Sequence, residues 1–385
     1  MRAHLVRGLC RARGIDVDVV TTSREGQAFL AAMGTPSTLL SAHFAVAFDG
    51  CHDMSRPRTD ACILRYYTDP TRGLRDLVRL HRLARGACFV VNDSLHPALL
   101  VAPLVSRMRV VHVFGDNIWA ATSDNFVGRA PAWFDRLYRR VLGRLRDAAF
   151  ACIVHTIDPD ARAHAGEHAI VLPPILPSPS RTPVEVRAAL GLGPHDRLAA
   201  VYLNPHFHDP RVAAAVESAL AVRGFRMHAV GEGYRGRPGW RGEDPDLASV
   251  VRAADVFVSG AGMGALAQAK VFGTPLVALL GAQPEQEKNA AALARSRAPF
   301  AAVSLAATDL ARAVGQAVEA VSAPHLRALS GSADDVHDAW TRAFLDLVTL
   351  AEKGASREAA DVHSVPRPRD QQPARRRIVA GRTAA

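Results

Sequence analysis

The sequence predicts an α/β protein built from two parallel sheets, each covered by helices, with a ligand cleft between them. Three times an amphipathic stretch ends in Arg-Gly and is followed by an apolar run, at Gly14, Gly86 and Gly224. A glycine just past a helix end, followed by a β-rich run, is a helix-to-strand turn. Strands that alternate with helices in this way are typical of parallel sheets. Further strands are expected at 109–114, 151–155, 198–203, 256–259 and 276–280.

A proline-rich stretch divides these strands into two groups. Four prolines fall within Pro173–Pro179, which cannot be helical and is expected to be an extended linker. Near the end of the chain, apolar side chains share one helix face around Trp340 and Phe344, and a Pro-, Arg- and Gln-rich tail without aromatics follows. The expected organisation is therefore a first domain at 1–172, a linker at 173–183, a second domain at 184–332, a closing helix at 333–353 and a disordered basic tail at 354–385.

Composition excludes several classes of protein. No apolar run reaches the roughly 18 residues that span a bilayer. Five cysteines without a C-x-x-C pair are typical of reduced thiols in a cytoplasmic protein. The formal charge is +10, but 353–385 alone holds eight basic and three acidic residues, which is half of the excess. Because no reader motif accompanies this charge, nucleic acid is not expected as a partner.

The most informative stretch is a glycine-rich turn that follows an apolar strand. Val256–Val258 runs into Gly260, Gly262 and Gly264, and a helix of small residues comes next. Such a turn directs backbone N–H groups and the positive end of a helix dipole at one point, which suits a phosphate. The alternative is that the glycines only permit a tight strand-to-helix turn.

Motif spacing around this turn resembles the donor-nucleotide site of GT-B glycosyltransferases with a family 28-like C-terminal domain. The nearest likeness is to the branch of the lipid-II-forming N-acetylglucosaminyltransferase. That family also has G-H-x-x-R at the start of its first helix, and this chain has His4 and Arg7. The resemblance implies a GT-B fold and a hexosyltransferase-type enzyme that uses a nucleotide diphosphate sugar, with UDP expected, and neither metal nor cofactor. The matching residues are Ala254-Asp255, Ser259, Gly262, Gln268, Gly273, Pro275, Gln286 and Asn289-Ala290.

The chain departs from the family pattern in three places. The strand and glycine loop that precede the family's histidine have no counterpart before His4, so either translation begins upstream or the first domain has lost an edge of its site. The family's ribose-binding glutamate is Gln268 here, with Ala265 replacing a small hydroxyl residue. The second domain's first strand leads into Asn204-Pro205-His206 instead of a glycine loop. Two alternatives stay open: a non-catalytic nucleotide-sugar-binding partner subunit, and a sugar-nucleotide 2-epimerase-like enzyme.

The resemblance assigns roles to individual residues. His4 is the leading base, because an imidazole titrates near neutral pH and can accept a hydroxyl proton. Asp93 and His96 follow a strand and form a second candidate pair, unless Asp93 only caps the next helix. Asp116, Asn117 and Trp119, with His112 before them, are expected to line the acceptor pocket. The expected donor-binding residues are Ser259, Gly260, Ala261, Gly262, Met263, Gly264, Gln268, Gln286, Asn289, Asn204 and His206.

Residues 131–146 form a basic amphipathic pattern. One interpretation is peripheral contact with an anionic membrane on its inner face, where a lipid-linked acceptor would lie. The alternative is an ordinary helix that covers the sheet and exposes its arginines to water. The acceptor is accordingly expected to be a small molecule or a lipid-linked one.

Overall fold

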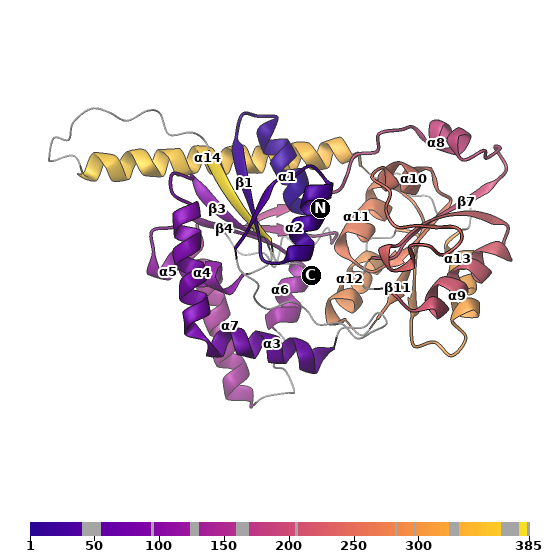
Figure 1. Cartoon of the computed structure of the whole chain (residues 1–385), viewed down its shortest axis with the longest axis horizontal. Helices are drawn as coiled ribbons and strands as arrows, with labels where there is room; N and C mark the ends of the chain where they lie inside the picture. The colour runs from indigo at the N-terminus through magenta and orange to yellow at the C-terminus, as the bar shows by residue number, and fades with distance from the viewer. Residues whose placement is uncertain are drawn as a thin grey trace.

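The computed structural model describes residues 1–40, 55–93, 96–123, 131–158, 169–204, 207–281, 283–295, 298–322, 331–362 and 377–382. These residues form two α/β domains that lie side by side (Figure 1). Within the described ranges the first sheet has seven strands in the order β2-β1-β13-β3-β4-β5-β6, and the second has six in the order β12-β11-β10-β7-β8-β9. Every strand pairs in parallel with its neighbours. The predicted fold class is confirmed.

The first domain begins with a helix that leads through an Arg-Gly turn into a strand. Gly14 and Gly86 have φ of 73° and 78°, the left-handed conformation that a helix-to-strand turn requires. The elements are α1 (Arg2–Arg11), β1 (Asp16–Thr21), α2 (Arg24–Ala32), β2 (Ser37–Leu39), α3 (Arg56–Thr68), α4 (Pro70–Leu83), β3 (Phe89–Asp93), α5 (Pro97–Val105), β4 (Val110–Gly115), α6 (Asp116–Ser123), α7 (Ala132–Asp147), β5 (Ala151–His155) and β6 (Ala169–Leu172).

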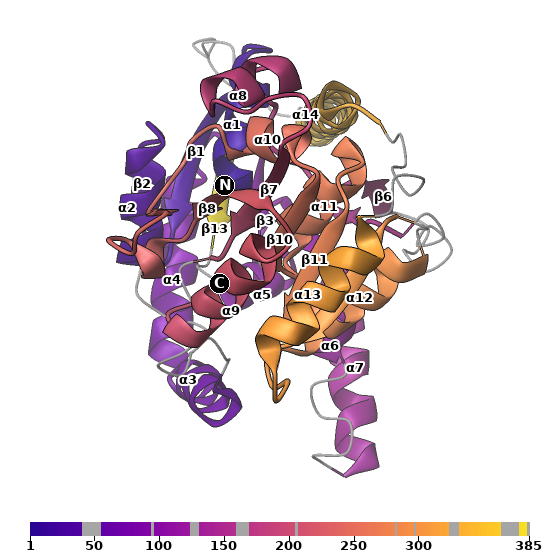
Figure 2. The same cartoon turned by 90° about the vertical axis from the view of Figure 1, so that its right-hand side faces the viewer.

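The second domain covers both faces of its sheet with helices. One buried cluster lies under α9 and α13, and another lies under α8, α10, α11 and α12. Figure 2, in which this domain faces the viewer, shows α9 and α13 next to each other. The elements are α8 (Pro183–Ala189), β7 (Arg197–Tyr202), α9 (Pro210–Ala221), β8 (Phe225–Val230), the 3₁₀ helix η2 (Glu232–Tyr234), β9 (Trp240–Arg241), α10 (Leu247–Ala253), β10 (Val256–Gly260), α11 (Met263–Phe272), β11 (Leu276–Leu280), α12 (Pro284–Arg295), β12 (Phe300–Ser304) and α13 (Leu310–Val321).

A long helix, α14 (Ala333–Val362), returns from the second domain and packs on the first (Figure 1). Trp340 and Phe344 are buried in the core of the first domain, together with residues of α1 and the first sheet. The indole Nε1 of Trp340 donates to the carbonyl oxygen of Pro173 at 2.8 Å, which ties the helix to the extended segment between the domains. In the part of the chain that the structure describes, no helix has both the length and the apolar character needed to cross a bilayer.

The expectation of a disordered tail over 354–385 is wrong for two of its parts. Residues 354–362 continue α14, and Arg377–Arg382 form β13, an interior strand of the first sheet that lies between β1 and β3. Ile378 and Val379 are 0% exposed and Ala380 is 2% exposed. A short apolar run therefore lies within an arginine-rich composition, and it gains its strand structure from pairing on both sides with β1 and β3.

Candidate functional site

The glycine-rich turn lies at the carboxyl end of β10 and opens into α11. Gly262 is the N-cap residue of α11, and no side chain hydrogen bond caps this end of the helix in the described structure. Gly262 and Gly264 are exposed, and a Cβ atom built on either would meet no described atom within 4 Å. The start of α11 thus presents backbone N–H groups toward open space, as an anion site requires.

Two other glycines near this turn have a steric role. A Cβ on Gly260 would lie 3.3 Å from the ring of Phe207, and one on Gly233 would lie 2.1 Å from the Phe207 carbonyl oxygen. Phe207 belongs to the loop after β7, the neighbour of β10 in the sheet. The predicted donor-binding residue Asn204 begins this loop at the same sheet edge, whereas His206 lies outside the described residues.

Three predicted donor-binding residues hold the turn from inside. Ser259 is 2% exposed, and its Oγ donates to the carbonyl oxygen of Tyr202 at 2.8 Å. Ala261 and Met263 belong to the buried cluster under α10, α11 and α12. Their side chains therefore shape the turn, and only their backbone groups are placed to serve a ligand.

Gln268 lies one helical turn beyond Gly264. Its Nε2 donates to the Gly264 carbonyl oxygen at 3.4 Å. Its Oε1 is buried and has no hydrogen-bond partner among the described residues. Because a buried amide oxygen gains from a donor, this atom is suited to accept a hydrogen bond from a ligand hydroxyl.

Gln286 and Asn289 lie on α12 and bond within the protein. The Oε1 of Gln286 accepts from the Gly281 N–H at 3.2 Å. Asn289 is 0% exposed, and its Nδ2 donates to the carbonyl oxygen of Ala261 at 3.1 Å. Asn289 thereby fixes the backbone of the glycine turn, a role that helix-face spacing alone does not reveal.

Asn289 also connects the two domains. Its Oδ1 accepts from the Nδ2 of Asn117 at 3.0 Å, and Asp116 beside Asn117 accepts from the Thr156 Oγ1 at 2.7 Å. The structure therefore brings the predicted acceptor-pocket residue Asn117 into contact with the donor domain, where α6 packs on α12 (Figure 1), whereas Asp116 bonds within the first domain. Trp119 points elsewhere, because its ring packs on Phe114 with the centroids 5.2 Å apart.

Sequence reasoning missed a charged cluster around Arg2 at the start of α1. Its Nε lies 2.7 Å from the Asp93 Oδ1, and its Nη1 contacts the Nε2 of His155. Burial, and then the charge of Arg2, lower the pKa of His155 well below its usual value. Across the domain interface, burial raises the pKa of Glu285, while its hydrogen bond with Asn289 and the charge of Arg2 lower it. Asp93 was predicted because it follows a strand and His155 ends a predicted strand, whereas Arg2 and Glu285 carried no sequence signal.

His4 lies in the first turn of α1 and is half-buried. Its Nδ1 is 2.7 Å from the Oγ1 of Thr35. Its pKa is lowered, mainly because burial penalises the charged imidazolium. The imidazole is consequently neutral at pH 7 and able to accept a proton, as expected of a base.

The predicted pair of Asp93 and His96 has two different sets of partners. Asp93 pairs with Arg2, whereas His96 caps α5 by accepting from the Ala98 N–H at 3.1 Å. The Nε2 of His96 lies 3.9 Å from the Oδ2 of Asp76. The alternative in which Asp93 caps the helix is therefore wrong, since His96 does so.

His112 does not line an acceptor pocket. It is 0% exposed in the middle of β4, and its Nδ1 lies 3.2 Å from the Nδ2 of Asn92. Burial lowers the pKa of this imidazole to about 4. His112 is a neutral core residue, so its side chain is not available to an acceptor.

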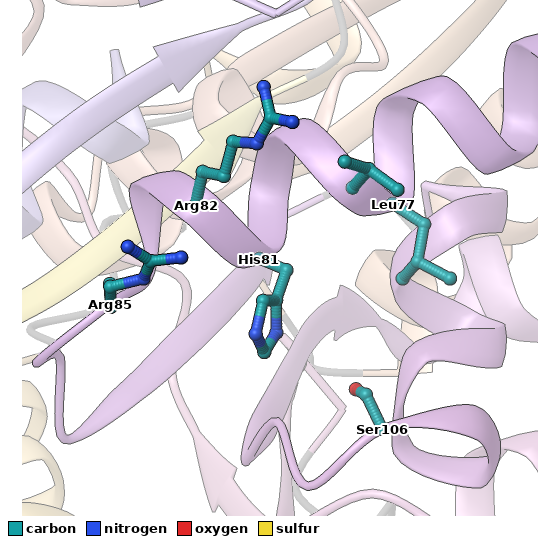
Figure 3. Close-up of a pocket in the computed structure, with 6 residues that line it drawn as sticks. Leu77, His81, Arg82, Arg85 and Ser106 are labelled. Carbon is teal, nitrogen blue, oxygen red and sulfur yellow. The ribbon is translucent and has the colours of Figure 1, made fainter.

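A separate hollow of about 250 Å³ lies on the outer face of the first domain, between α4 and the end of α5. Leu77, His81, Arg82 and Arg85 come from or follow α4, and Ser106 faces them from the end of α5 (Figure 3). Figure 1 places both helices on the side of the first domain away from the glycine turn. The hollow is apolar with basic side chains around it.

Two parallel-sheet domains, with a glycine turn beside their interface, define a GT-B fold, and solved structures agree. The glycotransferase of kitacinnamycin has a TM-score of 0.57 at 16% identity, covering 92% of this chain and 94% of its own. LpCGTa in complex with UDP has a TM-score of 0.56 at 15% identity, covering 91% and 95%. UGT89C1 of Arabidopsis thaliana has a TM-score of 0.56 at 15% identity, covering 89% and 95%.

No protein-family model and no curated protein sequence matches the chain. At these identities the similar structures establish the fold. They confirm the GT-B part of the sequence resemblance, and the branch of the lipid-II-forming enzyme stays a prediction.

Proposed function

We propose that the protein is a hexosyltransferase that moves a sugar from a UDP-linked donor to an acceptor hydroxyl without a metal ion. The observation that carries this proposal is the open turn from Gly260 to Gly264 at the start of α11. Similar structures support it, because they are glycosyltransferases and two of them are complexes with UDP.

The donor diphosphate would lie at the glycine turn. N–H groups at Gly262 and Gly264, with the dipole of α11, would balance the negative charge that grows on the leaving group. The unpartnered Oε1 of Gln268 would accept from a ribose hydroxyl. Asn204 would approach from the end of the neighbouring β7. Asn289 would hold the turn in shape through Ala261.

His4 would serve as the base on the acceptor side. Its lowered pKa leaves the imidazole neutral, and Thr35 fixes the orientation of the ring. Asp93 is less suited to this role, since its carboxylate is engaged in an ion pair with Arg2. Asp93 and Arg2 would instead position the start of α1.

The donor site is tested by Gly262→Val. Gly262 has φ −75° and open space around its Cβ position, so valine should fold normally and fill the place of the phosphate. UDP affinity measured by calorimetry should fall by on the order of 10²-fold or more, each tenfold being about 1.4 kcal/mol. Gly143→Val, at an equally open position on α7, is the matched control. Unchanged UDP affinity in Gly262→Val would contradict the donor-site assignment.

The acceptor side includes a surface suited to an anionic lipid bilayer. On α7, Trp133, Leu137 and Val141 are 62%, 50% and 46% exposed. The neighbouring α5 exposes Leu104 and Val105, and arginines flank both helices. Apolar side chains with a basic rim are typical of peripheral membrane contact. This surface supports a lipid-linked acceptor, in keeping with the predicted likeness to the lipid-II branch.

A further inference from the structure

One interior strand of the first sheet, β13, comes from a distant part of the chain. β13 pairs with β1 from Arg377 to Arg382 and with β3 from Ile378 to Arg382, parallel to both. Figure 1 shows this yellow strand between the indigo β1 and the purple β3. In a doubly wound sheet of order 3-2-1-4-5-6, that place belongs to the strand that leads into the first helix. Here the first helix is α1, and β13 occupies the place before it.

Both faces of β13 are covered, as an interior parallel strand requires. Ile378 and Ala380 face the cluster that contains Trp340 and Phe344. Val379 faces the opposite cluster, under α4 and α5. At the start of the strand, Arg377 pairs with Asp18, and its carbonyl oxygen accepts from the Cys88 N–H at 2.7 Å.

The strand fits its slot with one small void beside it. A cavity of about 10 Å³ lies beside Ala380, bordered by Val91, Val113 and Phe344. Among residues 377–380, where burial is described, three side chains are buried, and the smallest of them lies next to the void. Such a short segment must offset the entropy of its own ordering with these three buried side chains and the two hydrogen-bonded ladders to β1 and β3.

We propose that the slot between β1 and β3 is a peptide-binding site that the chain's own segment Arg377–Arg382 occupies reversibly. The register brings Gly381 and Arg382 opposite Asn92 and Asp93, at the edge where Arg2 meets Asp93 and His155. Occupancy of the slot therefore controls the acceptor-side edge and leaves the glycine turn of the second domain unchanged. This last step rests on the proposed transferase function.

The test uses the full chain, folded before it is cut. A protease recognition sequence is inserted within 363–376, the purified protein is cleaved, and a fluorescent peptide of residues 371–385 is added in excess. The labelled peptide should replace the native strand with saturable anisotropy, and a Val379→Asp peptide should bind at least 100-fold more weakly. Val379 is the suited control position because it is 0% exposed.

Three outcomes decide the proposal. No exchange over several days, with the cleaved strand still bound, would overturn it, as would equal binding of the Val379→Asp peptide. Transfer activity that falls on cleavage and returns with the peptide, while UDP affinity stays constant, would support control of the acceptor side. Peptide exchange in a protein that shows no transfer at any stage would leave the slot established and remove the proposed function instead.

Discussion

The carboxyl edges of the two sheets are built in different ways. In the second domain, the glycine turn, Gln268, Gln286 and Asn289 all come from one continuous stretch that runs from the end of β10 through α11 and β11 into α12. In the first domain, the corresponding edge joins the start of α1 to the ends of β3, β5 and β13, and Arg2 contacts a residue 153 positions away. A site encoded in one stretch can be recognised from local spacing, whereas a site assembled from distant segments requires the fold.

The largest effect should come from His4→Ala, which should impair the first-domain edge and leave the donor edge of the second domain intact. Loss of the base should lower turnover by about 10²–10⁴-fold, because proton transfer from the acceptor hydroxyl loses its positioned group. UDP affinity should stay as in the wild type, since the donor edge belongs to the other domain. Both quantities are measured on the same preparation, by steady-state kinetics and by calorimetry.

Thr35→Val is the matched variant for this experiment, because it leaves His4 in place and removes the hydroxyl at its Nδ1. A smaller loss of turnover is expected there, from a less well oriented ring. Full activity of His4→Ala would transfer the role of base to another residue of the first edge, with Asp93 the first to examine.

The same contrast explains what the sequence could predict of the fold. β5 and β11 occupy the predicted ranges 151–155 and 276–280, because the first four residues of each form a buried apolar run. β2 and β9 have three and two residues, too short to show a periodic pattern. β13 was predicted to be disordered, since its strand structure depends on the slot that β1 and β3 leave between them.

The candidate site follows the same division. Local spacing placed the glycine turn and its open N–H groups correctly at the start of α11. Local spacing could not show that the Asn289 side chain hydrogen-bonds to Ala261 and Asn117, because those partners lie on other elements. Nor could it show that His96 faces Asp76 instead of Asp93.

The second-largest effect concerns stability: His112, in the first domain, should make the free energy of unfolding depend on pH. The pKa of His112 is lowered from 6.5 to about 4, so between these values the unfolded chain binds a proton that the folded chain does not. The free energy of unfolding therefore decreases as the pH falls from 6.5 toward 4. At about 1.4 kcal/mol per pKa unit, His112 contributes about 3 kcal/mol to this loss.

His112→Leu removes this titration while filling a similar volume in β4. The stability of the wild type relative to His112→Leu, measured by urea unfolding, should fall by about 3 kcal/mol between pH 7 and pH 4. His155 and His4 contribute in the same direction in both proteins, because burial lowers the pKa of each. A difference between the two proteins that does not change with pH would show that His112 titrates in the folded protein as it does in the unfolded chain.

The smallest expected effect compares the outer surfaces of the two domains. Leu137 of the first domain is 50% exposed among the arginines of α7, whereas Val222 of the second domain is 80% exposed at the end of α9. If the first domain contacts the membrane, Leu137→Asp should weaken binding to vesicles rich in anionic lipid by about tenfold, as expected when one apolar side chain no longer enters the bilayer interface. Val222→Asp adds the same charge to a more exposed valine and should leave vesicle binding unchanged.

Cosedimentation at low and at high salt measures both variants, and the wild type should lose affinity with salt because its arginines contact lipid headgroups. Equal losses in the two variants would show that net charge alone governs binding, and the specific role of α7 would then fail.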